Sequence, residues 1–247
     1  MTGADAARPG DDAALAEQVR YYRERAPEYD DWFLRRGRYD RGPEATAAWE
    51  AEVAEVAAAL ARFGARGRVL ELAGGTGWWT SRLAATADEL TVVDAAPEVL
   101  ARNRARVGDP TVRYVEADLF SWRPDRTWDA RSDPTWDVVA FTFFLSHVPP
   151  ERFEGFWAMV RACLAPGGRV FFADSRHVES STSVDQDLPP AGATTAVRRL
   201  EDGREYTIVK VFHEPDALER RLAALGWHAT VRATPTYFVV GEAVPAP

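Results

Sequence analysis

A hydrophobic run enters a glycine-rich turn at residues 69–77, and this segment is the best suited of any in the chain to hold a ligand. Residues 69–72 predict a strand, and a helix is expected directly after the turn. Gly75 and Gly77 allow the backbone to bend sharply and to approach a ligand closely, because glycine has no Cβ atom. Unpaired N–H groups at the start of the following helix favour a nucleotide-like ligand.

Two other ligand-binding motifs fit this turn less well. A dinucleotide site favours G-x-G-x-x-G, but here the spacing is Gly75-x-Gly77 with Trp79 two residues further on. A phosphate loop ends in Gly-Lys-Ser/Thr, and this turn contains no lysine. A dinucleotide-dependent oxidoreductase therefore remains only the weaker alternative.

Two carboxylates follow the next two predicted strands. Asp94 ends the run at 90–93, and Asp118 lies after the run at 112–115. A carboxylate at the first position can accept both hydroxyls of a ribose. Asp118 can reach an adenine amino group while Leu119 covers the ring; the alternative is that Asp118 caps the chain that follows it.

Five segments in order carry a family pattern: Glu71-x-Ala73-x-Gly75-x-Gly77, Asp94, 116–118, 136–139 and 164–168. The chain thereby resembles the class I (Rossmann-like) S-adenosylmethionine-dependent methyltransferases, of the small-molecule type. The resemblance implies S-adenosyl-L-methionine as cofactor and contacts to it from the loop, from Asp94 and from Ala95. Glu71 is expected either to brace the loop or to reach the cofactor's amino group. Ala73 stands where the first glycine usually lies, which predicts a slightly altered turn and a retained site.

The segment after the fourth predicted strand, residues 141–151, lies beside the transferred methyl group in this family. Phe141 and Thr142 are expected to line the cofactor, because they stand at the strand end. His147 is the candidate catalytic residue, since histidine titrates near neutrality and can take a proton from a hydroxyl or an amine. The alternative is a histidine that bonds its own loop and braces the turn before Pro149.

Aromatic residues near the N-terminus offer a cover for the cofactor. In many relatives of the resembled family an N-terminal helix contributes a tyrosine to the cofactor. Tyr22 and Tyr29 are seven residues apart and could share a helix face, although Pro27 interrupts that spacing. The alternative is plain aromatic packing. Arg25 and the two arginines before it are interpreted as a solvated face.

Asp174 and His177 follow the fifth predicted strand, where substrate also approaches in this fold. With His147 they could form a base or a metal site, but the match to metal-dependent relatives is thin, and no metal is predicted. Cys163 is the only cysteine, which excludes an intrachain disulfide framework and a cysteine-cluster zinc site.

Strands that alternate with helices predict an α/β fold with a mostly parallel seven-stranded sheet and helices on both faces. By resemblance the strand order is 3-2-1-4-5-7-6, with strand 7 antiparallel. We expect a disordered tail at 1–12, an N-terminal helical lid at 13–64 and the methyltransferase domain at 65–247. Within it, an insertion at 175–212 with a hairpin around 201–203 is expected to cover the substrate. The expected helices are 13–36, 43–63, 78–85, 97–107, 151–164 and 215–225, and the remaining strands are 137–141, 169–173, 228–233 and 236–241.

Net charge and hydropathy indicate which classes of binding partner are disfavoured. The net charge is −8, and an acidic surface repels phosphate backbones, so nucleic acid is disfavoured. No window approaches about 18 continuous apolar residues and the N-terminus has no apolar signal region, so no membrane partner is expected and a cytoplasmic enzyme is the simplest interpretation. The loop at 121–135 carries tryptophans and is either a surface excursion or a contact in a homodimer.

The sequence therefore predicts a methyltransferase that acts on oxygen, nitrogen or carbon of a small organic acceptor by in-line transfer. A dry aromatic pocket helps by not over-stabilising the charged sulfonium, and Phe141, Phe143, Phe144 and the N-terminal tyrosines are candidates to supply it. A natural-product acceptor is suggested by analogy alone. The main alternative is a non-catalytic protein that binds the same cofactor, because Ala73 departs from the motif and no base is certain.

Overall fold

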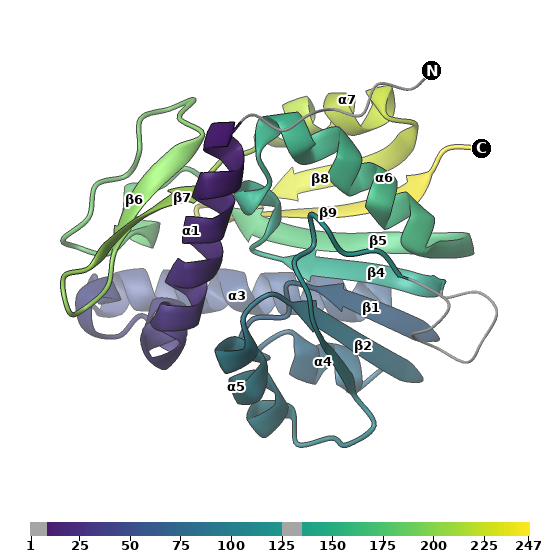
Figure 1. The fold of residues 1–247 in the computed structure, drawn as a ribbon, viewed down its shortest axis with the longest axis horizontal. Helices are drawn as coiled ribbons and strands as arrows, with labels where there is room; N and C mark the ends of the chain where they lie inside the picture. Colours follow the sequence, from purple (N-terminus) through teal and green to yellow (C-terminus); the bar gives the residue numbers. More distant parts are fainter. Residues whose placement is uncertain (1–8, 125–134) are drawn as a thin grey trace.

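The central sheet is built from strands far apart in the chain (Figure 1). A computed structural model describes residues 9–124 and 135–247 of the protein. Within these residues the sheet has seven strands, in the spatial order β3 (Arg113–Glu116), β2 (Glu89–Asp94), β1 (Arg68–Leu72), β4 (Trp136–Thr142), β5 (Leu164–Ser175), β9 (Phe238–Pro245) and β8 (Trp227–Ala233). β1 to β5 run parallel, and β9 is antiparallel to both of its neighbours. The predicted strand order and its antiparallel seventh strand are confirmed.

Helices cover both faces of this sheet and complete two apolar cores. One core contains side chains of α6 (Phe153–Cys163) and α7 (Pro215–Ala224), and the other contains side chains of α3 (Pro43–Phe63), α4 (Thr80–Ala84) and α5 (Pro97–Val107). The strands between them are apolar on both faces, which is typical of a parallel sheet. The predicted α/β architecture is therefore correct.

Helix ends follow local chemistry. α3 and α5 each begin with proline in the first turn and end before a glycine, Gly64 or Gly108, in the left-handed conformation (φ 66° and 65°). Proline suits the first turn because the missing N–H would have no partner there, and glycine adopts positive φ without a Cβ clash. This is why the bounds of both helices could be predicted to the residue.

The N-terminal segment is helical from its first described residue. α1 (Pro9–Arg25) is followed by the 3₁₀ turn η1 (Ala26–Glu28) and by α2 (Tyr29–Phe33), so the chain breaks at Pro27 as expected. Residues 9–12 belong to α1, which corrects the predicted disordered tail at 1–12, since Pro9 can occupy the first turn of a helix. Residues 1–8 lie outside the described residues.

The insertion after β5 forms a separate antiparallel hairpin of β6 (Thr195–Arg199) and β7 (Glu205–Val209). α1 lies between this hairpin and the ends of the central strands (Figure 1). Gln18 Oε1 accepts the N–H of Val209 at 3.1 Å, and the rings of Tyr21 and Tyr206 lie 5.6 Å apart. Helix and hairpin therefore cover the carboxyl edge of the sheet together.

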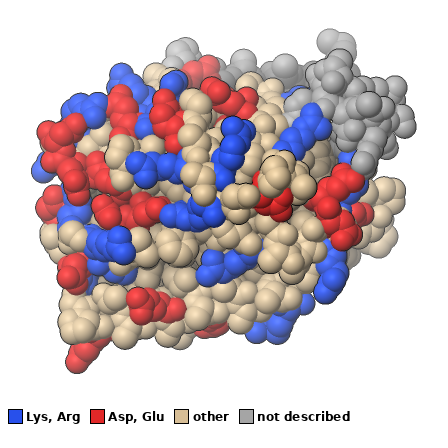
Figure 2. All heavy atoms as spheres, turned by 90° about the horizontal axis from the view of Figure 1, so that it is seen from below, with Lys and Arg blue, Asp and Glu red and all other residues tan. Residues whose placement is uncertain are grey.

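Two further features concern possible partners. The face in Figure 2 carries acidic and basic side chains interspersed, with no broad area of one sign among its described residues. No helix of the described chain is long and apolar enough to cross a bilayer. Most of the loop at 121–135 lies outside the described residues, so its role as a surface excursion or dimer contact stays open.

Candidate active site

The glycine-rich loop after β1 is held against α5 by one buried side chain. Asn103 Nδ2 donates to the carbonyl oxygens of Gly74 (3.0 Å) and Gly75 (3.1 Å) and to the Thr80 hydroxyl (2.7 Å). Gly77 has φ 93°, and a Cβ there would lie 3.0 Å from the Cα of Asn103. Glycine is thus required at 77 for close packing, and Asn103 is a loop-holding residue that sequence reasoning missed.

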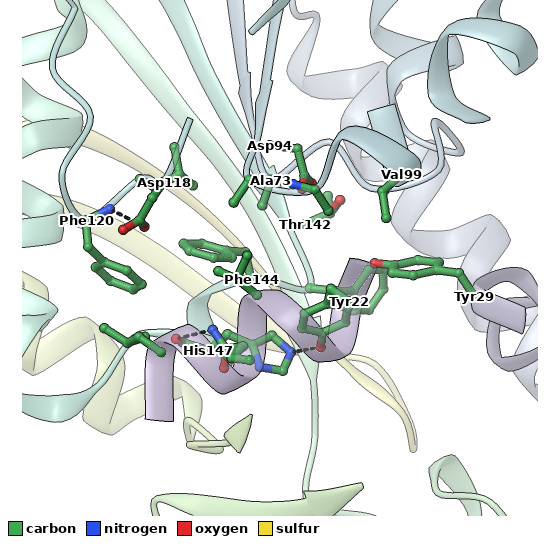
Figure 3. A pocket seen from close by; sticks show the side chains of 17 residues that line it. Tyr22, Tyr29, Ala73, Asp94, Val99, Asp118, Phe120, Thr142, Phe144 and His147 are labelled. Carbon is green, nitrogen blue, oxygen red and sulfur yellow. Dashed lines mark hydrogen bonds between the residues drawn. The ribbon is translucent and has the colours of Figure 1, made fainter. Parts of the chain in front are cut away.

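Ala73 opens the loop with φ 54°, a left-handed conformation that a non-glycine residue rarely adopts. Alanine occupies it here while its side chain faces the cavity beside Thr142 (Figure 3). The turn therefore forms with alanine in the first glycine position, and the backbone carries the strain.

Asp94, at the end of β2, faces the mouth of this loop. Its Oδ2 accepts the N–H of Gly75 and its Oδ1 accepts the N–H of Ala96, both at 3.0 Å. Each oxygen keeps acceptor capacity for a ligand, because a carboxylate oxygen offers about two lone-pair sites. Burial raises the pKa of the Asp94 carboxyl, and the main-chain donors oppose that rise.

Glu71 lies beneath the loop rather than in the open cavity. It is buried, it accepts a hydrogen bond from Thr80, and burial raises the pKa of its carboxyl to about 8. Among the described residues its Oε2 atom has no hydrogen-bond partner. The Thr80 contact fits the loop-bracing alternative, and the unpaired oxygen leaves one acceptor for a donor that the protein itself does not supply.

A cavity of about 710 Å³ opens between this loop, the ends of β2 and β4, and α1 (Figure 3). Nine of the predicted site residues line it: Tyr22, Tyr29, Ala73, Asp94, Ala95, Asp118, Leu119, Thr142 and His147. Tertiary structure thus brings together side chains that the sequence places 125 positions apart.

The predicted residues outside the cavity lining have a structural explanation. Gly75 and Gly77 form the loop itself. The Tyr29 hydroxyl covers Gly75, and a Cβ at position 75 would lie 3.2 Å from that hydroxyl oxygen. Phe141 is a correction: it is fully buried, stacks on Phe172 at 5.6 Å and does not line the cavity. Successive side chains of a strand point to opposite faces, so Thr142 faces the cavity and Phe141 faces the core.

Asp118 makes the predicted cap and also lines the cavity, while its contact with adenine stays a prediction. Its Oδ1 accepts the N–H of Phe120 at 3.0 Å, which caps the turn, and the residue also lines the cavity. Leu119 is buried beside it.

Sequence reasoning missed several residues of the same wall. They come from α1, from α5 and from the turns after β2 and β3: Leu15, Gln18, Val19, Ala96, Val99 and Phe120. A signal for α1 was present, because Leu15, Val19 and Tyr22 follow the spacing of one helix face.

His147 joins the lid to the hairpin. The Tyr22 hydroxyl and His147 Nε2 are 2.8 Å apart, and His147 Nδ1 lies 2.7 Å from the Val209 carbonyl oxygen. A carbonyl only accepts, so Nδ1 carries the proton and Nε2 accepts from Tyr22. Burial, with the positive charge of Lys210, holds the pKa of His147 well below its usual value, so the imidazole is neutral at pH 7. These side-chain contacts reach α1 and the hairpin instead of the histidine's own loop, which differs from the predicted bracing of the turn before Pro149. The lone pair of Nε2 is what a base would need.

A second cavity, of about 670 Å³, lies on the other side of the same residues. The two cavities share Tyr22, Tyr29, Phe143 and His147. Phe143 has φ 57°, an outlier for a bulky side chain, and its ring packs 5.2 Å from that of Trp32. The rest of the second cavity comes from the lid, the hairpin and the segment after β5: Tyr21, Arg25, Trp32, Tyr39, Ser175, Ser181, Thr182, Ser183, Gln186, Arg198, Ile208, Lys210 and Phe212.

The candidates at the end of β5 and just beyond it, Asp174 and His177, have protein partners. Asp174 is buried and accepts the N–H groups of Ser146 and Ser175, each at 2.7 Å. His177 Nε2 lies 2.7 Å from the carbonyl oxygen of Pro189. In the part of the chain that the structure describes, no three His, Cys, Asp or Glu side chains gather as metal ligands.

The sheet order, the loop after β1 and the acid after β2 define the class I (Rossmann-like) S-adenosylmethionine-dependent methyltransferase fold. The sequence matches a family model described as a methyltransferase domain over residues 44–230, and the chain belongs to this family. This membership removes the support for a dinucleotide-dependent oxidoreductase.

Two solved structures of DhpI match over nearly the whole chain. The DhpI–SAH complex is 36% identical with a TM-score of 0.76, covering 95% of this chain and 98% of DhpI. The DhpI–SAM–HEP complex is also 36% identical with a TM-score of 0.76, covering 97% and 100%. These relatives are S-adenosylmethionine-type complexes, as the resemblance in the sequence implies.

Two further relatives are also methyltransferases. A demethylmenaquinone methyltransferase of Clavibacter sepedonicus is 33% identical over 108 residues, which is 43% of this chain and 40% of that protein. The chain thus matches less than half of that relative. The 1,6-didemethyltoxoflavin-N1-methyltransferase of Burkholderia thailandensis is 20% identical, with a TM-score of 0.58 over 100% of this chain and 94% of that one. At this identity the likeness concerns the fold alone.

Proposed function

We propose that the protein transfers a methyl group from S-adenosylmethionine, held in the first cavity, to a small organic acceptor held in the second. The observation that carries this proposal is the shared wall: Tyr22, Tyr29, Phe143 and His147 line both cavities. A protein that only bound the cofactor would have no use for a second cavity against the reacting end of the first.

The residues of the first cavity fit the cofactor. Asp94 offers two fixed carboxylate oxygens for a ribose diol, and Asp118 with Leu119 offers an acceptor and an apolar cover for adenine. The unpaired Oε2 of Glu71 supplies a buried acceptor under the loop. Bound there, S-adenosylmethionine supplies an electrophilic methyl group. The SAH and SAM complexes of DhpI support this assignment.

The protein's own part is to orient the acceptor, to exclude water and to remove a proton where the acceptor carries one. α1 lines both cavities and the hairpin lines the second, and Tyr22, Tyr29 and Phe143 give the shared wall an aromatic surface. For a hydroxyl or amine acceptor, His147 takes the proton at Nε2, once the Tyr22 hydroxyl has turned to the substrate. An acceptor that is already ionised needs only the alignment.

Two measurements test this function. Calorimetric titration with S-adenosylhomocysteine is expected to show a single site of roughly micromolar Kd, near −8 kcal/mol. Labelled S-adenosylmethionine is then incubated with a panel of small alcohols, amines, phenols and acids. Failure to bind S-adenosylhomocysteine would refute the cofactor assignment, and binding without transfer to any acceptor would leave the non-catalytic alternative in place.

Comparison of His147→Gln with Tyr22→Phe separates the two roles of the histidine. Glutamine can keep a hydrogen bond to Tyr22 but cannot accept a proton, so a base role predicts a fall in kcat of about 10²–10⁴-fold with S-adenosylhomocysteine affinity retained. Equal and small effects of both variants would assign His147 to bracing the lid instead.

A further inference from the structure

The second cavity collects positive charge without matching negative charge. Arg25 from α1, Arg198 from β6 and Lys210 after β7 all line it, and none of its described lining residues is a carboxylate. Arg25 and Lys210 are only 9% and 8% exposed. The arginine that the sequence suggested for a solvated face is therefore a wall of this cavity.

Arg25 has no counter-ion within the described residues. Its guanidinium lies over the rings of Tyr29 (5.1 Å) and Tyr21 (5.6 Å), and its hydrogen bond to the Tyr39 hydroxyl is long, at 3.4 Å. Glu28, which acts on Arg25 only at longer range, accepts the N–H of residue 201 instead. A buried guanidinium with five donors and one weak acceptor is costly unless another partner binds it.

Lys210 is only partly compensated. Its Nζ donates to the Ser146 hydroxyl at 2.8 Å and lies 3.9 Å from Asp174 Oδ1. Both carboxylate oxygens of Asp174 already accept main-chain N–H groups. Burial lowers the pKa of Lys210 to about 8. With Arg198, which forms no ion pair among the described residues, the cavity keeps two positive charges that this one carboxylate does not balance.

Buried hydroxyls complete the wall opposite α1. Ser181, Thr182 and Ser183 are at most 7% exposed. Their segment is fixed from the lid: Arg35 donates to the carbonyl oxygens of residues 180 and 181, and Arg41 to those of 179, 182 and 183. The Ser181 hydroxyl already donates to the carbonyl oxygen of Val178 at 2.8 Å, whereas the buried Ser183 Oγ has no hydrogen-bond partner among the described residues. Ser183, Arg25 and Lys210 thus bring donors to the cavity from three separate segments.

We infer that the second cavity binds a doubly charged tetrahedral oxyanion, such as a phosphoryl-type group, and that this group is part of the methyl acceptor. Two uncompensated charges match a dianion better than a single carboxylate. Donors from α1, from the end of β7 and from the 181–183 segment match oxygens that point in several directions better than a planar group. The statement about the acceptor rests on the proposed function, whereas the anion site itself does not.

The anion also bears on His147. Lys210, Arg198 and Arg25 each disfavour the protonated imidazole. A dianion bound among these cations offsets that effect, so His147 becomes a better proton acceptor when the cavity is filled. The same group that anchors the acceptor therefore prepares the base.

The experiment measures binding of simple anions at constant ionic strength, with and without saturating S-adenosylhomocysteine. Sodium sulfate and inorganic phosphate are the tetrahedral probes, malonate is a dianion with two separate planar carboxylates, acetate is a monoanion with one carboxylate, and chloride keeps the ionic strength constant. Sulfate and phosphate are expected to bind at least tenfold more tightly than acetate or malonate. Equal affinities, or no binding of sulfate, would overturn the inference, and tighter malonate would replace it by a dicarboxylate site.

Variants locate the site. Arg25→Met and Lys210→Met are expected to weaken sulfate at least tenfold, since a hydrogen bond to a charged group is lost. Arg20→Met is the matched control, because Arg20 lies on the same helix, exposed and outside the second cavity. Retained S-adenosylhomocysteine binding shows that each variant is folded. Loss in all three variants alike, or in none, would overturn the assignment. Because sulfate binding is also measured on cofactor-free protein, it tests the anion site even if the proposed methyl transfer fails.

Discussion

Replacement of Asp94 by asparagine is the sharpest test of the cofactor cavity. In the protein its two carboxylate oxygens are fixed by the N–H groups of Gly75 and Ala96, each at 3.0 Å. Both oxygens therefore point where a ribose diol is expected. Asparagine has the same shape but no charge, and one of its two positions becomes an NH₂ group that cannot accept.

The magnitude follows from these bonds. A hydrogen bond to a charged group contributes about 1.5–3 kcal/mol, and a neutral one about 0.5–1.5 kcal/mol. Asparagine removes one of the two hydrogen bonds expected from the ribose hydroxyls and makes the other one neutral. We therefore expect S-adenosylhomocysteine to bind about 3 kcal/mol more weakly, which is roughly 100-fold in Kd.

Isothermal titration calorimetry of Asp94→Asn measures this weakening, with thermal unfolding as the check on folding. Asp109→Asn is the matched control, because Asp109 also accepts a main-chain N–H, that of Thr111 at 2.8 Å, but lies outside both cavities. The reasoning is refuted if a folded Asp94→Asn protein binds within threefold of the wild type, or if Asp109→Asn is weakened as much.

Three further predictions concern strain and protonation. Ala73→Gly removes the cost of φ 54° at a non-glycine residue, which is about 1–2 kcal/mol, and adds a backbone entropy cost of about 0.4–1 kcal/mol. Urea unfolding should therefore show a gain in the free energy of unfolding of up to about 1.6 kcal/mol, and a loss would contradict the strain. The pKa of His147 is lower in the folded protein than in the unfolded chain. As the pH falls below about 6.5, the unfolded chain therefore takes up this proton first, and the free energy of unfolding decreases by up to about 1.4 kcal/mol for each pH unit. His147→Gln should lose less stability than the wild type between pH 7 and pH 5.5, and equal losses would refute the assignment. Sulfate stays dianionic, so its affinity should fall above pH 8 as Lys210 loses its proton, and Lys210→Arg should remove that fall; a persisting fall would assign it to another group. The groups that face Lys210 are Arg25, Ser146, His147, Asp174, Arg198, Phe212 and His213.

Much of the fold could be predicted because its signals are local. α3 and α5 begin at proline and end at glycine, so both bounds were available from neighbouring residues. The strands could be predicted as apolar runs between polar turns. The orientation of the side chains on the fourth strand could not be predicted. Both faces of a central parallel strand are apolar, so no alternation of polar and apolar residues marks which side chain faces the site. This is why Phe141 was assigned to the cofactor while Thr142 lines the cavity.

By itself the sequence determined the parallel sheet, the loop after its first strand and the acid after its second, because each depends on residues close together in the chain. Only the tertiary structure decided which side chains line the second cavity at the carboxyl edge of the sheet. Arg25, Ser183 and Lys210 belong to a helix, a loop and a segment just after a strand, and their spacing in the sequence has no common period. They meet because α1 packs against the hairpin, and that packing converts an arginine with the appearance of a surface residue into a buried charge of the second cavity.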